Sequence, residues 1–371
     1  MIDHKKICVL GAGVSGLSTA YLLLEKGYQV NIISRDDPDK NSSKPHFSSL
    51  FPAASIIPHG IHTEKLTELF RVSQRYFKNL HDEGFPGINI TQHYELFSYS
   101  KKMPEYASEM NQLEVLDEFR NKFYPDHPKY KAISGWKFNT FLADWPIYFP
   151  HLISTVLEKV SGFEVRDLDG SDLSHLPFDV IINCTGIGSM DLFDDYSPGL
   201  IHRGHLINVP TAPPVLNKKG QVVSYNFSPG QQVYQSETGN HQDVYCYSRH
   251  NDIVLGGSRQ KGTIDKNGTW MGETNRGPIA TIDGLEVPLK ILELHKDILR
   301  HSFDYDLPHI TKMRSKLGYR FTRAENNGLR IEIEEIEDKL VIHNYGHGGA
   351  GVTLSWGCAQ RVVDMLHSAN I

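Results

Sequence analysis

The 371-residue sequence lacks any apolar run long enough to cross a membrane. Its first residues pass directly into an apolar strand pattern at 5–10, without the charged and apolar regions of a signal peptide. We therefore expect a soluble, cytoplasmic protein. The length predicts about two domains, because a single hydrophobic core rarely grows beyond roughly 250–300 residues.

Basic tracts are also missing, and the formal net charge is −6 at pH 7. A surface that neutralises nucleic-acid phosphates needs clustered Lys and Arg, so nucleic acid is excluded as a partner. Cysteine is scarce, and its four copies stand apart in apolar strand or helix patterns. This usage predicts buried, reduced thiols instead of a disulfide framework at Cys8, Cys184, Cys246 and Cys358.

Two common catalytic signatures do not occur. The 19 histidines show no metal-ligand grouping beyond the pairs His59/His62 and His202/His205, and such pairs are usually solvated or hydrogen-bonded. No Gly-x-Ser-x-Gly elbow is present to hold a serine nucleophile. We expect no bound metal and no serine-hydrolase chemistry.

Glycine is abundant near the end of the chain. An apolar strand pattern at Lys339–Ile342 leads into the sequence HNYGHGGAGVT at 343–353, and a helical pattern follows from Leu354. Glycine loses the most backbone freedom on folding, so this density indicates that something approaches the backbone closely. A glycine turn at a helix N-terminus favours a phosphate or an electron-rich ring. A sharp turn that only packs the last helix on a sheet explains this stretch equally well.

The other end of the chain favours the cofactor interpretation. Gly11-Ala12-Gly13-Val14-Ser15-Gly16 follows the strand pattern at 5–10 and precedes a helical pattern at 17–24 that ends at Gly27. These glycines permit a tight turn, close approach of a pyrophosphate and helix–strand contact, which makes the segment a dinucleotide fingerprint in its required context.

Two further strand patterns belong to the same fold. Residues 28–33 end at Ser34-Arg35-Asp36, where an acidic side chain normally holds a ribose hydroxyl; a solvated turn before Pro38 is the alternative. Residues 178–183 are apolar and run into Cys184-Thr185-Gly186. Because these glycine-ended strands are far apart in the chain, we predict an α/β fold whose Rossmann-like cofactor domain is assembled from discontinuous segments.

The intervening residues show two other patterns. Helical spacing occurs at 63–83 and within 139–160, whereas residues 200–260 contain alternating strand patterns. These patterns predict a second, mixed α+β substrate domain with a large antiparallel sheet. Polar and glycine-rich residues at 36–49 and 258–277 predict loops.

Six motifs occur in a characteristic order along the chain: Val9–Leu17, Asn183–Gly186, His202–His205, Val254–Gly257, Gly318–Arg323 and Val341–Ala359. In these motifs and their order the sequence resembles the D-amino acid oxidase family of flavoproteins, which includes D-aspartate oxidase and, more distantly, glycine oxidase. The resemblance implies FAD, not NAD, and a two-domain fold with the flavin between the domains. It implies an FAD-binding domain at 1–50, 140–190 and 305–371, and a substrate-binding domain at 51–139 and 191–304.

The resemblance also implies residue roles at the substrate. Arg320 would form paired hydrogen bonds to the α-carboxylate, Tyr245 would assist through its hydroxyl, and the Gly349 carbonyl would accept a hydrogen bond from the amine. Further pocket residues are His241, Tyr247 and Ile57. The alternatives are a surface arginine at 320 and ordinary sheet packing for both tyrosines.

Cofactor contacts are implied in three groups. Backbone or hydroxyl groups of the C-terminal turn would meet the flavin ring, and the N-terminal fingerprint would meet the pyrophosphate. The remaining contacts come from the strand ends and the loop after the second strand. Besides residues 11–16, the implied contacts are Ser34, Arg35, Asp36, Ser48, Ser49, Ala54, Ser55, Thr185, Gly186, Gly348, Gly349, Gly351, Val352 and Thr353.

The implied reaction is hydride transfer from a D-amino acid to FAD, followed by release of hydrogen peroxide, a 2-oxo acid and ammonia. The partners are an amino acid and dioxygen, with a homodimer as an open alternative. An amine dehydrogenase or biosynthetic tailoring oxidase on the same scaffold, and a non-catalytic flavin-binding protein, also stay open. The sequence departs from the family pattern at Phe321, where proline usually follows the arginine.

Overall fold

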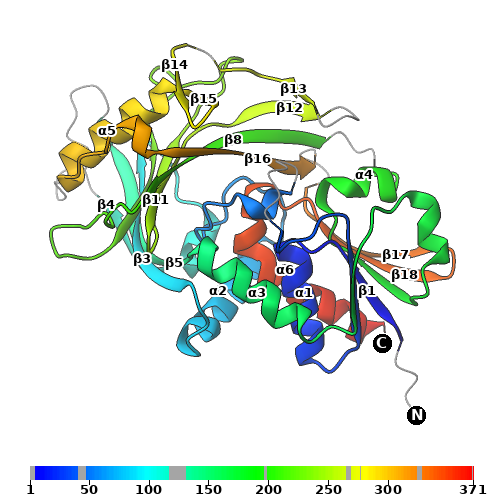
Figure 1. The fold of residues 1–371 in the computed structure, drawn as a ribbon. Coiled ribbons are helices and arrows are strands. Elements are labelled where there is room, and N and C mark those ends of the chain that lie inside the picture. The colour runs from blue at the N-terminus through cyan, green and yellow to red at the C-terminus, as the bar shows by residue number, and fades with distance from the viewer. Residues whose placement is uncertain are drawn as a thin grey trace. The chain divides into compact units, whose positions relative to one another are not determined.

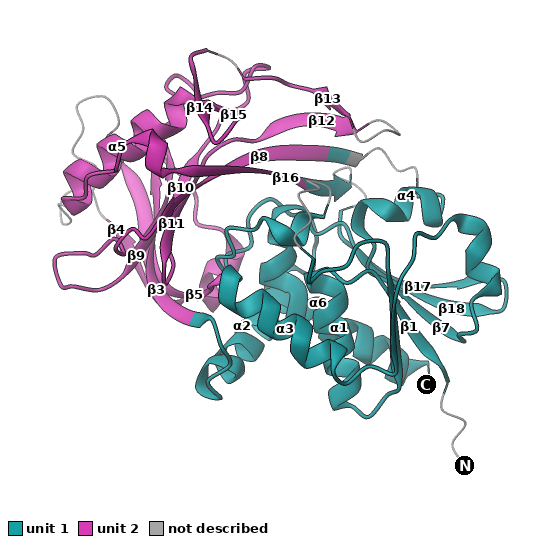
Figure 2. Ribbon diagram, viewed as in Figure 1, with its two compact units in different colours: residues 1–88, 145–200, 320–371 teal, residues 89–144, 201–319 magenta. Residues whose placement is uncertain are grey.

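The computed structural model describes residues 5–40, 47–116, 131–195, 199–264, 269–275, 277–323, 328–369 and 371. The chain divides into two compact units, shown in different colours in Figure 2. Unit 1 comprises residues 1–88, 145–200 and 320–371, and unit 2 comprises residues 89–144 and 201–319. Each unit is therefore assembled from segments that are distant in the sequence.

Unit 1 contains a six-stranded sheet that is parallel except at one edge (Figure 1). All neighbouring strands run parallel except the edge pair formed by β17 and β18. The central strands β1 and β7 are buried along their whole length, as expected of parallel strands covered on both faces. The order across the sheet is β17 (Arg330–Ile336), β18 (Lys339–Tyr345), β7 (Val180–Asn183), β1 (Ile7–Leu10), β2 (Val30–Ser34) and β6 (Gly162–Val165).

Four longer helices belong to unit 1: α1 (Val14–Glu25), α2 (Leu66–Asp82), α3 (Trp145–Leu157) and α6 (Gly351–Ser368). The helix α2 crosses α6 so closely that a Cβ atom at Gly357 would lie 2.1 Å from the Leu69 carbonyl oxygen. The Tyr76 ring stacks on Trp356 with 5.7 Å between centroids. This packing places residues 51–88 in unit 1, which corrects the predicted start of the substrate-binding domain at residue 51.

Unit 2 contains a ten-stranded sheet, a two-stranded sheet of β14 (Ile279–Ile282) and β15 (Leu285–Pro288), and helix α5 (Leu289–Phe303). The large sheet is mainly antiparallel, although β3 and β9 run parallel. Its order is β13 (Trp270–Gly272), β12 (Gln260–Ile264), β8 (Gly199–Pro210), β11 (Asp252–Gly256), β10 (Val244–Ser248), β9 (Val223–Ser228), β3 (Ile88–Phe97), β5 (Ser134–Ala143) and β4 (Asn111–Leu116), with β16 (Arg314–Arg323) paired to β8.

Three predictions about domain and loop boundaries need correction. Residues 305–319 belong to unit 2, because β16 pairs with β8 instead of joining the parallel sheet. Residues 258–277 are not simply a loop, because Gly262 and Gly272 face each other in the antiparallel pair β12–β13. Residues 191–200, predicted in the substrate-binding domain, belong to unit 1.

The predicted fold class is confirmed, with a discontinuous α/β unit and a second unit built on a large, mainly antiparallel sheet. All four cysteines are buried and free, as predicted. Within the described part of the chain, no helix is both long enough and apolar enough to span a bilayer.

Candidate functional site

The turn between β1 and α1 can be built only from glycine at two positions. Gly11 has a positive φ of 98°, and a Cβ atom there would lie 2.7 Å from the Cys184 carbonyl oxygen. A Cβ atom at Gly16 would lie 1.9 Å from the Gly11 carbonyl oxygen. The turn therefore packs directly against the end of β7, with helix α1 pressed onto it.

The start of α1 has the chemistry of an anion site. Its first turn, fully described, contains no acidic residue, and Gly13 provides no side-chain cap. The Ala12 N–H donates to Ser34 Oγ over 3.2 Å, and the Val14 N–H donates to Ser49 Oγ over 3.0 Å. The positive end of the helix dipole thus faces hydroxyls and no carboxylate, an arrangement that suits a pyrophosphate.

Predicted cofactor contacts from three separate segments therefore meet at this turn. Ser34 ends β2, and Ser49 lies in the short helix η1 (Ser48–Leu50). The Trp145 indole N–H donates to the Ser49 carbonyl over 2.8 Å and fixes this segment against α3. Sequence reasoning missed Trp145, because no local pattern relates it to a serine 96 positions earlier.

The acidic residue after β2 lies close to this turn. Ser34 Oγ donates to the Asp36 carbonyl over 2.8 Å, and Arg35 Nε lies 3.2 Å from Asp36 Oδ2. The Asp36 side chain is 10% exposed and that of Arg35 is 44% exposed. The carboxylate is thus the more enclosed partner, as a ribose-binding group would need to be.

The C-terminal glycine segment packs on the loop around His59 and Gly60. The Gly349 N–H donates to the Gly60 carbonyl over 3.1 Å. A Cβ atom at Gly348, whose φ is +55°, would lie 2.3 Å from that same oxygen, and one at Gly349 would lie 2.8 Å from the His59 carbonyl. Glycine is therefore required here by contact with the chain itself, apart from any ligand.

The same loop is held to the start of α6. The Thr353 hydroxyl lies 3.0 Å from the Ile57 carbonyl and 3.2 Å from the Ser55 carbonyl. Ala54 adopts a left-handed backbone with φ of 66°, which is uncommon for a residue other than glycine. The first turn of α6, which includes Gly351 and Val352, contains no acidic residue and no side-chain cap. The structure thus brings together the predicted site residues 54, 55, 57, 348, 349 and 351–353, but the Thr353 hydroxyl is used within the protein.

His347 joins the two glycine segments, and sequence reasoning gave it no role. Its Nε2 lies 3.0 Å from Asn344 Oδ1, and its Nδ1 lies 3.5 Å from Ser15 Oγ. Burial lowers the pKa of His347 to about 4, so the ring is neutral at pH 7. An amide oxygen can only accept, so Nε2 carries the proton and Nδ1 accepts from Ser15. The only sequence signal was its position between Gly346 and Gly348.

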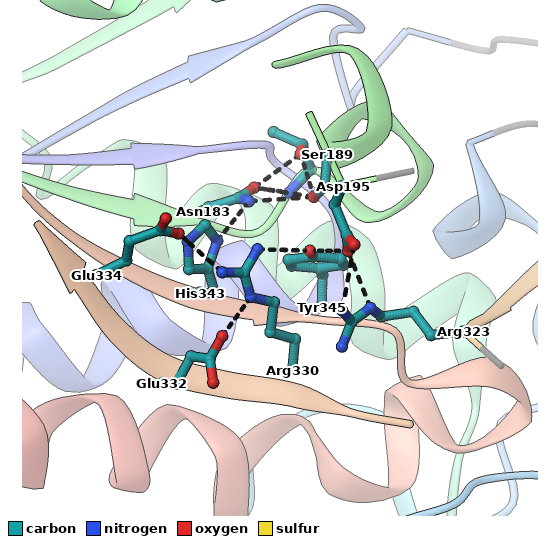
Figure 3. A network of polar contacts seen from close by, with 10 residues as sticks. Asn183, Ser189, Asp195, Arg323, Arg330, Glu332, Glu334, His343 and Tyr345 are labelled. Carbon is teal, nitrogen blue, oxygen red and sulfur yellow. Dashed lines mark hydrogen bonds and ion pairs between the residues drawn. The ribbon is translucent and has the colours of Figure 1, made fainter. Parts of the chain in front are cut away.

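A network of polar side chains connects the turn after β7 to β17 and β18 (Figure 3). Asn183 Oδ1 accepts from the Thr185 N–H over 3.1 Å, and Asn183 Nδ2 donates to His343 Nδ1 over 3.0 Å. His343 Nε2 lies 2.8 Å from Glu334 Oε2, which also pairs with Arg330 over 2.7 Å. Asn183 thereby holds Thr185, a predicted cofactor contact, in place. At Gly186, φ is +61° and no atom lies within 4 Å of the Cβ position, so the backbone conformation alone favours glycine.

The second half of this network surrounds Tyr345. Its hydroxyl donates to Asp195, and Arg323 Nε lies 2.9 Å from the same carboxylate (Figure 3). The Arg323 and Arg330 guanidinium carbons lie 5.6 Å and 6.0 Å from the centre of the Tyr345 ring. The network therefore fixes the residue before Gly346 and the end of β16, which carries Arg320.

The remaining predicted substrate residues are divided between the units. Arg320 is half-buried on β16 and belongs to unit 1, as do Gly349 and Ile57. Tyr245 and Tyr247 lie on β10 in unit 2, and the Tyr245 ring lies over Gly256.

His241, also in unit 2, has Nε2 at 3.0 Å from Ser228 Oγ and 3.4 Å from Tyr99 Oη. Burial lowers the pKa of His241 below its usual value. Among the described residues, no group of three or more His, Cys, Asp or Glu side chains could hold a metal ion.

A Rossmann-like sheet, a glycine fingerprint and a helix N-terminus without an acidic residue define a dinucleotide-binding α/β protein. The sequence matches the DAO family, described as FAD dependent oxidoreductase, over residues 6–365. The chain belongs to this family of FAD-dependent oxidoreductases, and FAD is its cofactor. The acid-free first turn of α1 and the Ser49 hydroxyl beside it, together with the enclosed Asp36, suit the pyrophosphate and ribose of that cofactor.

Two curated relatives match nearly the whole chain. A D-amino-acid oxidase of Rubrobacter xylanophilus is 25% identical over 97% of this chain and 95% of its own length. A D-aspartate oxidase of Homo sapiens is 26% identical over 98% and 95%, respectively. Among solved structures, an L-proline dehydrogenase from P. horikoshii aligns with a TM-score of 0.65, at 12% identity, over 100% of this chain and 95% of that one. That structural likeness concerns the fold alone.

Proposed function

We propose that this enzyme oxidises a D-amino acid to an imino acid, which water hydrolyses to a 2-oxo acid and ammonia. Dioxygen is the proposed electron acceptor, and hydrogen peroxide is the second product. Full-length similarity to relatives named D-amino-acid oxidase and D-aspartate oxidase supports this reaction. The structural observation that carries it is the glycine segment at 346–351, whose Gly349 N–H is used by Gly60. The carbonyl is then the polar backbone group that Gly349 offers to a substrate amine.

The proposed roles divide between binding and orientation. Arg320 binds the α-carboxylate through two parallel N–H bonds, for which a planar guanidinium is well shaped. The Tyr245 hydroxyl adds a hydrogen bond to the same carboxylate, and the Gly349 carbonyl accepts one from the neutral amine. These contacts orient the α-hydrogen without a side-chain base, since orientation alone lowers the barrier substantially. When bound, FAD would supply the hydride acceptor and the redox chemistry with dioxygen.

The geometry of unit 1 supports the proposed cofactor contacts. The fingerprint turn and Ser49 hold the pyrophosphate, and Asp36 holds the ribose. Backbone N–H groups at the start of α6 would hold the electron-rich side of the flavin ring and stabilise negative charge there.

The decisive experiment uses the purified protein with its bound flavin. Acidic, neutral and basic D-amino acids, each paired with its L-enantiomer, are added with and without air while flavin absorbance and peroxide are followed. We expect D-specific bleaching under anaerobic conditions and peroxide in air. If no D-amino acid bleaches a bound flavin, the proposal fails; bleaching without peroxide in air indicates a dehydrogenase that uses another acceptor.

Substitution of Arg320 tests the assigned carboxylate ligand. Arg320→Ala is expected to lower kcat/KM at least about 100-fold, because a hydrogen-bonded charge pair is lost, while flavin stays bound. Arg314→Ala is the matched control, since Arg314 lies on the same strand with a 57% exposed side chain. Equal activity of the Arg320→Ala and Arg314→Ala variants would remove Arg320 from the site. A homodimer, the remaining expectation about partners, is checked by light scattering of the same preparation.

A further inference from the structure

One face of the unit 2 sheet carries buried polar side chains, whereas the opposite face carries the apolar core. Along β3, Tyr94 and Leu96 belong to that core, while His93 and Glu95 point to the other face. The polar face continues across β9 and β10. Its members and their exposed fractions are His93 0%, Glu95 4%, Ser224 0%, Asn226 6% and Tyr247 3%.

The strand register aligns this face with Tyr245. The parallel pairing of β3 and β9 places Glu95 beside Asn226, and the antiparallel pairing of β9 and β10 places Asn226 opposite Tyr245. Glu95, Asn226 and Tyr245 thus form one row across three neighbouring strands. Tyr247 lies two residues along β10, on the same face as Tyr245.

A continuous chain of hydrogen bonds runs through this face. The Tyr247 hydroxyl donates its single proton to Asn226 Oδ1 over 2.9 Å. The Asn226 amide then donates from Nδ2 to Glu95 Oε1 over 3.0 Å. Because a phenol has one proton, the Tyr247 hydroxyl cannot also donate to a substrate carboxylate in this arrangement.

The chain ends on a buried carboxylate–imidazole pair. His93 Nε2 lies 3.1 Å from Glu95 Oε1, and His93 Nδ1 lies 2.8 Å from Ser224 Oγ. A carboxylate this deeply buried is costly unless strong donors compensate it. Glu95 accepts hydrogen bonds from an amide N–H and from a ring N–H. The His93–Glu95 pair therefore fixes one end of the network and the direction of its hydrogen bonds.

Tyr245 lies next to Tyr247, at the other end of this chain of hydrogen bonds. Its ring lies 5.5 Å from the Tyr247 ring, and it covers Gly256 so closely that a Cβ atom there would lie 2.0 Å from Tyr245 Cζ. Gly256 is itself held by His295, whose Nε2 lies 3.0 Å from the Gly256 carbonyl oxygen. Tyr247 on one side and Gly256 on the other leave the Tyr245 ring little freedom to turn.

We propose that the His93–Glu95 pair is a positioning element for the substrate-binding tyrosine. It fixes Asn226, which fixes Tyr247, and the Tyr247 ring holds Tyr245 over Gly256 with its hydroxyl set for the carboxylate. Tyr247 and Glu95 are positioning residues here, and of these three side chains Tyr245 is the one that touches substrate. This inference rests on the proposed function, in which Tyr245 binds the carboxylate.

The test compares three variants of the flavin-loaded enzyme. Tyr247→Phe removes only the hydroxyl, Glu95→Leu removes the carboxylate, and Glu95→Gln keeps an oxygen that can accept from Asn226. We expect KM for the best D-amino acid to rise roughly tenfold in Tyr247→Phe and Glu95→Leu, as for one lost buried hydrogen bond. In Glu95→Gln the rise is smaller, and kcat changes less than KM in all three, because Arg320 and Gly349 still orient the substrate.

A matched control lies on the opposite face of the same sheet. Tyr94 donates its hydroxyl to Gln92 over 2.7 Å within unit 2, so Tyr94→Phe loses a comparable hydrogen bond that does not lead to Tyr245. Its KM should equal that of the wild type. Flavin content and thermal melting of every variant show whether a change in KM reflects misfolding.

A double-mutant cycle identifies Tyr245 as the residue through which the pair acts. In a Tyr245→Phe background, Tyr247→Phe should raise KM no further, because the positioned hydroxyl is already gone. The inference would be overturned if the two substitutions raised KM additively, or if KM were unchanged in Tyr247→Phe and Glu95→Leu. Turnover of a D-amino acid by the wild type would in either case leave the proposed function intact. Absence of D-amino acid turnover in the wild type would instead reject the proposed function itself.

Discussion

Gly16 in unit 1 and Gly256 in unit 2 both occupy positions where a methyl group would collide, but with atoms of different kinds. The methyl of an alanine at Gly16 would lie 1.9 Å from the backbone oxygen of Gly11, within the fingerprint turn. At Gly256 it would lie 2.0 Å from Cζ and 2.3 Å from Oη of Tyr245, at the end of a side chain. A backbone atom in a packed turn cannot move away, whereas a methyl at Gly256 would push the Tyr245 ring out of its position. Glycine is therefore needed for the fold at position 16 and for the orientation of the Tyr245 side chain at position 256.

The largest expected effect is that of Gly16→Ala. Overpacking against backbone should destabilise the protein by about 3 kcal/mol or more and abolish flavin binding, since α1 can no longer seat on the turn. Thermal melting and flavin absorbance after gel filtration measure both effects. Gly170→Ala is the control, because its methyl would meet nothing closer than 3.6 Å. A stable, flavin-loaded Gly16→Ala protein would break the comparison.

Gly256→Ala should leave the flavin bound and weaken substrate binding. Displacement of the Tyr245 ring is expected to raise KM roughly tenfold, the equivalent of one hydrogen bond. The double variant Gly256→Ala/Tyr245→Ala isolates the cause: once the ring is absent, the added methyl should change KM no further. Loss of flavin from Gly256→Ala would mean that the two glycines act alike.

A smaller effect, a loss of stability in acid, is expected from buried histidines in both units. Burial lowers the pKa of His205 and His295 in unit 2, and of His347 in unit 1, from 6.5 to about 4. Between these values the unfolded chain binds more protons than the folded protein, so stability falls as the pH falls. From pH 6.5 to 5.5 we expect a loss on the order of 1 kcal/mol for each histidine, measured by urea unfolding. A free energy of unfolding that stays flat from pH 7 to 5 would contradict this assignment.

The smallest effect concerns the ion pair after β2. Arg35→Gln should raise the dissociation constant for FAD less than about threefold, because exposed ion pairs contribute about 0–1 kcal/mol. Asp36→Asn should raise it roughly tenfold if the carboxylate holds the ribose. Equilibrium titration of the apoprotein with FAD measures both constants. Equal effects would show that Arg35, too, contributes to the cofactor cradle.

The sequence predicted the elements in which local pattern and tertiary role agree. The glycine-ended strands β1, β7 and β18 were all recognised, because parallel central strands are continuously apolar and their turns need glycine. Helices α2 and α3 were also recognised from their periodicity. The membership of α2 in unit 1 was not, because it depends on the close crossing at Gly357, which periodicity does not encode.

The site residues show the same limit. The serines at 34 and 49 were assigned from the resemblance, and the structure gives them a common partner in the fingerprint turn. The supporting residues Trp145, His347 and the Asp195–Tyr345 network went unrecognised. Each acts through a contact with a segment far away in the chain, and a single buried polar residue leaves no periodic signal.

The strand order of unit 1 has a consequence for how the protein is made. β18 pairs with β7, yet about 150 residues separate them in the chain. At roughly 5–20 residues per second, a ribosome needs on the order of 10–30 s to supply the missing neighbour. During that interval the apolar edge of β7 is open to pairing with other nascent chains. Yield in a host should therefore depend on chaperone supply and growth temperature.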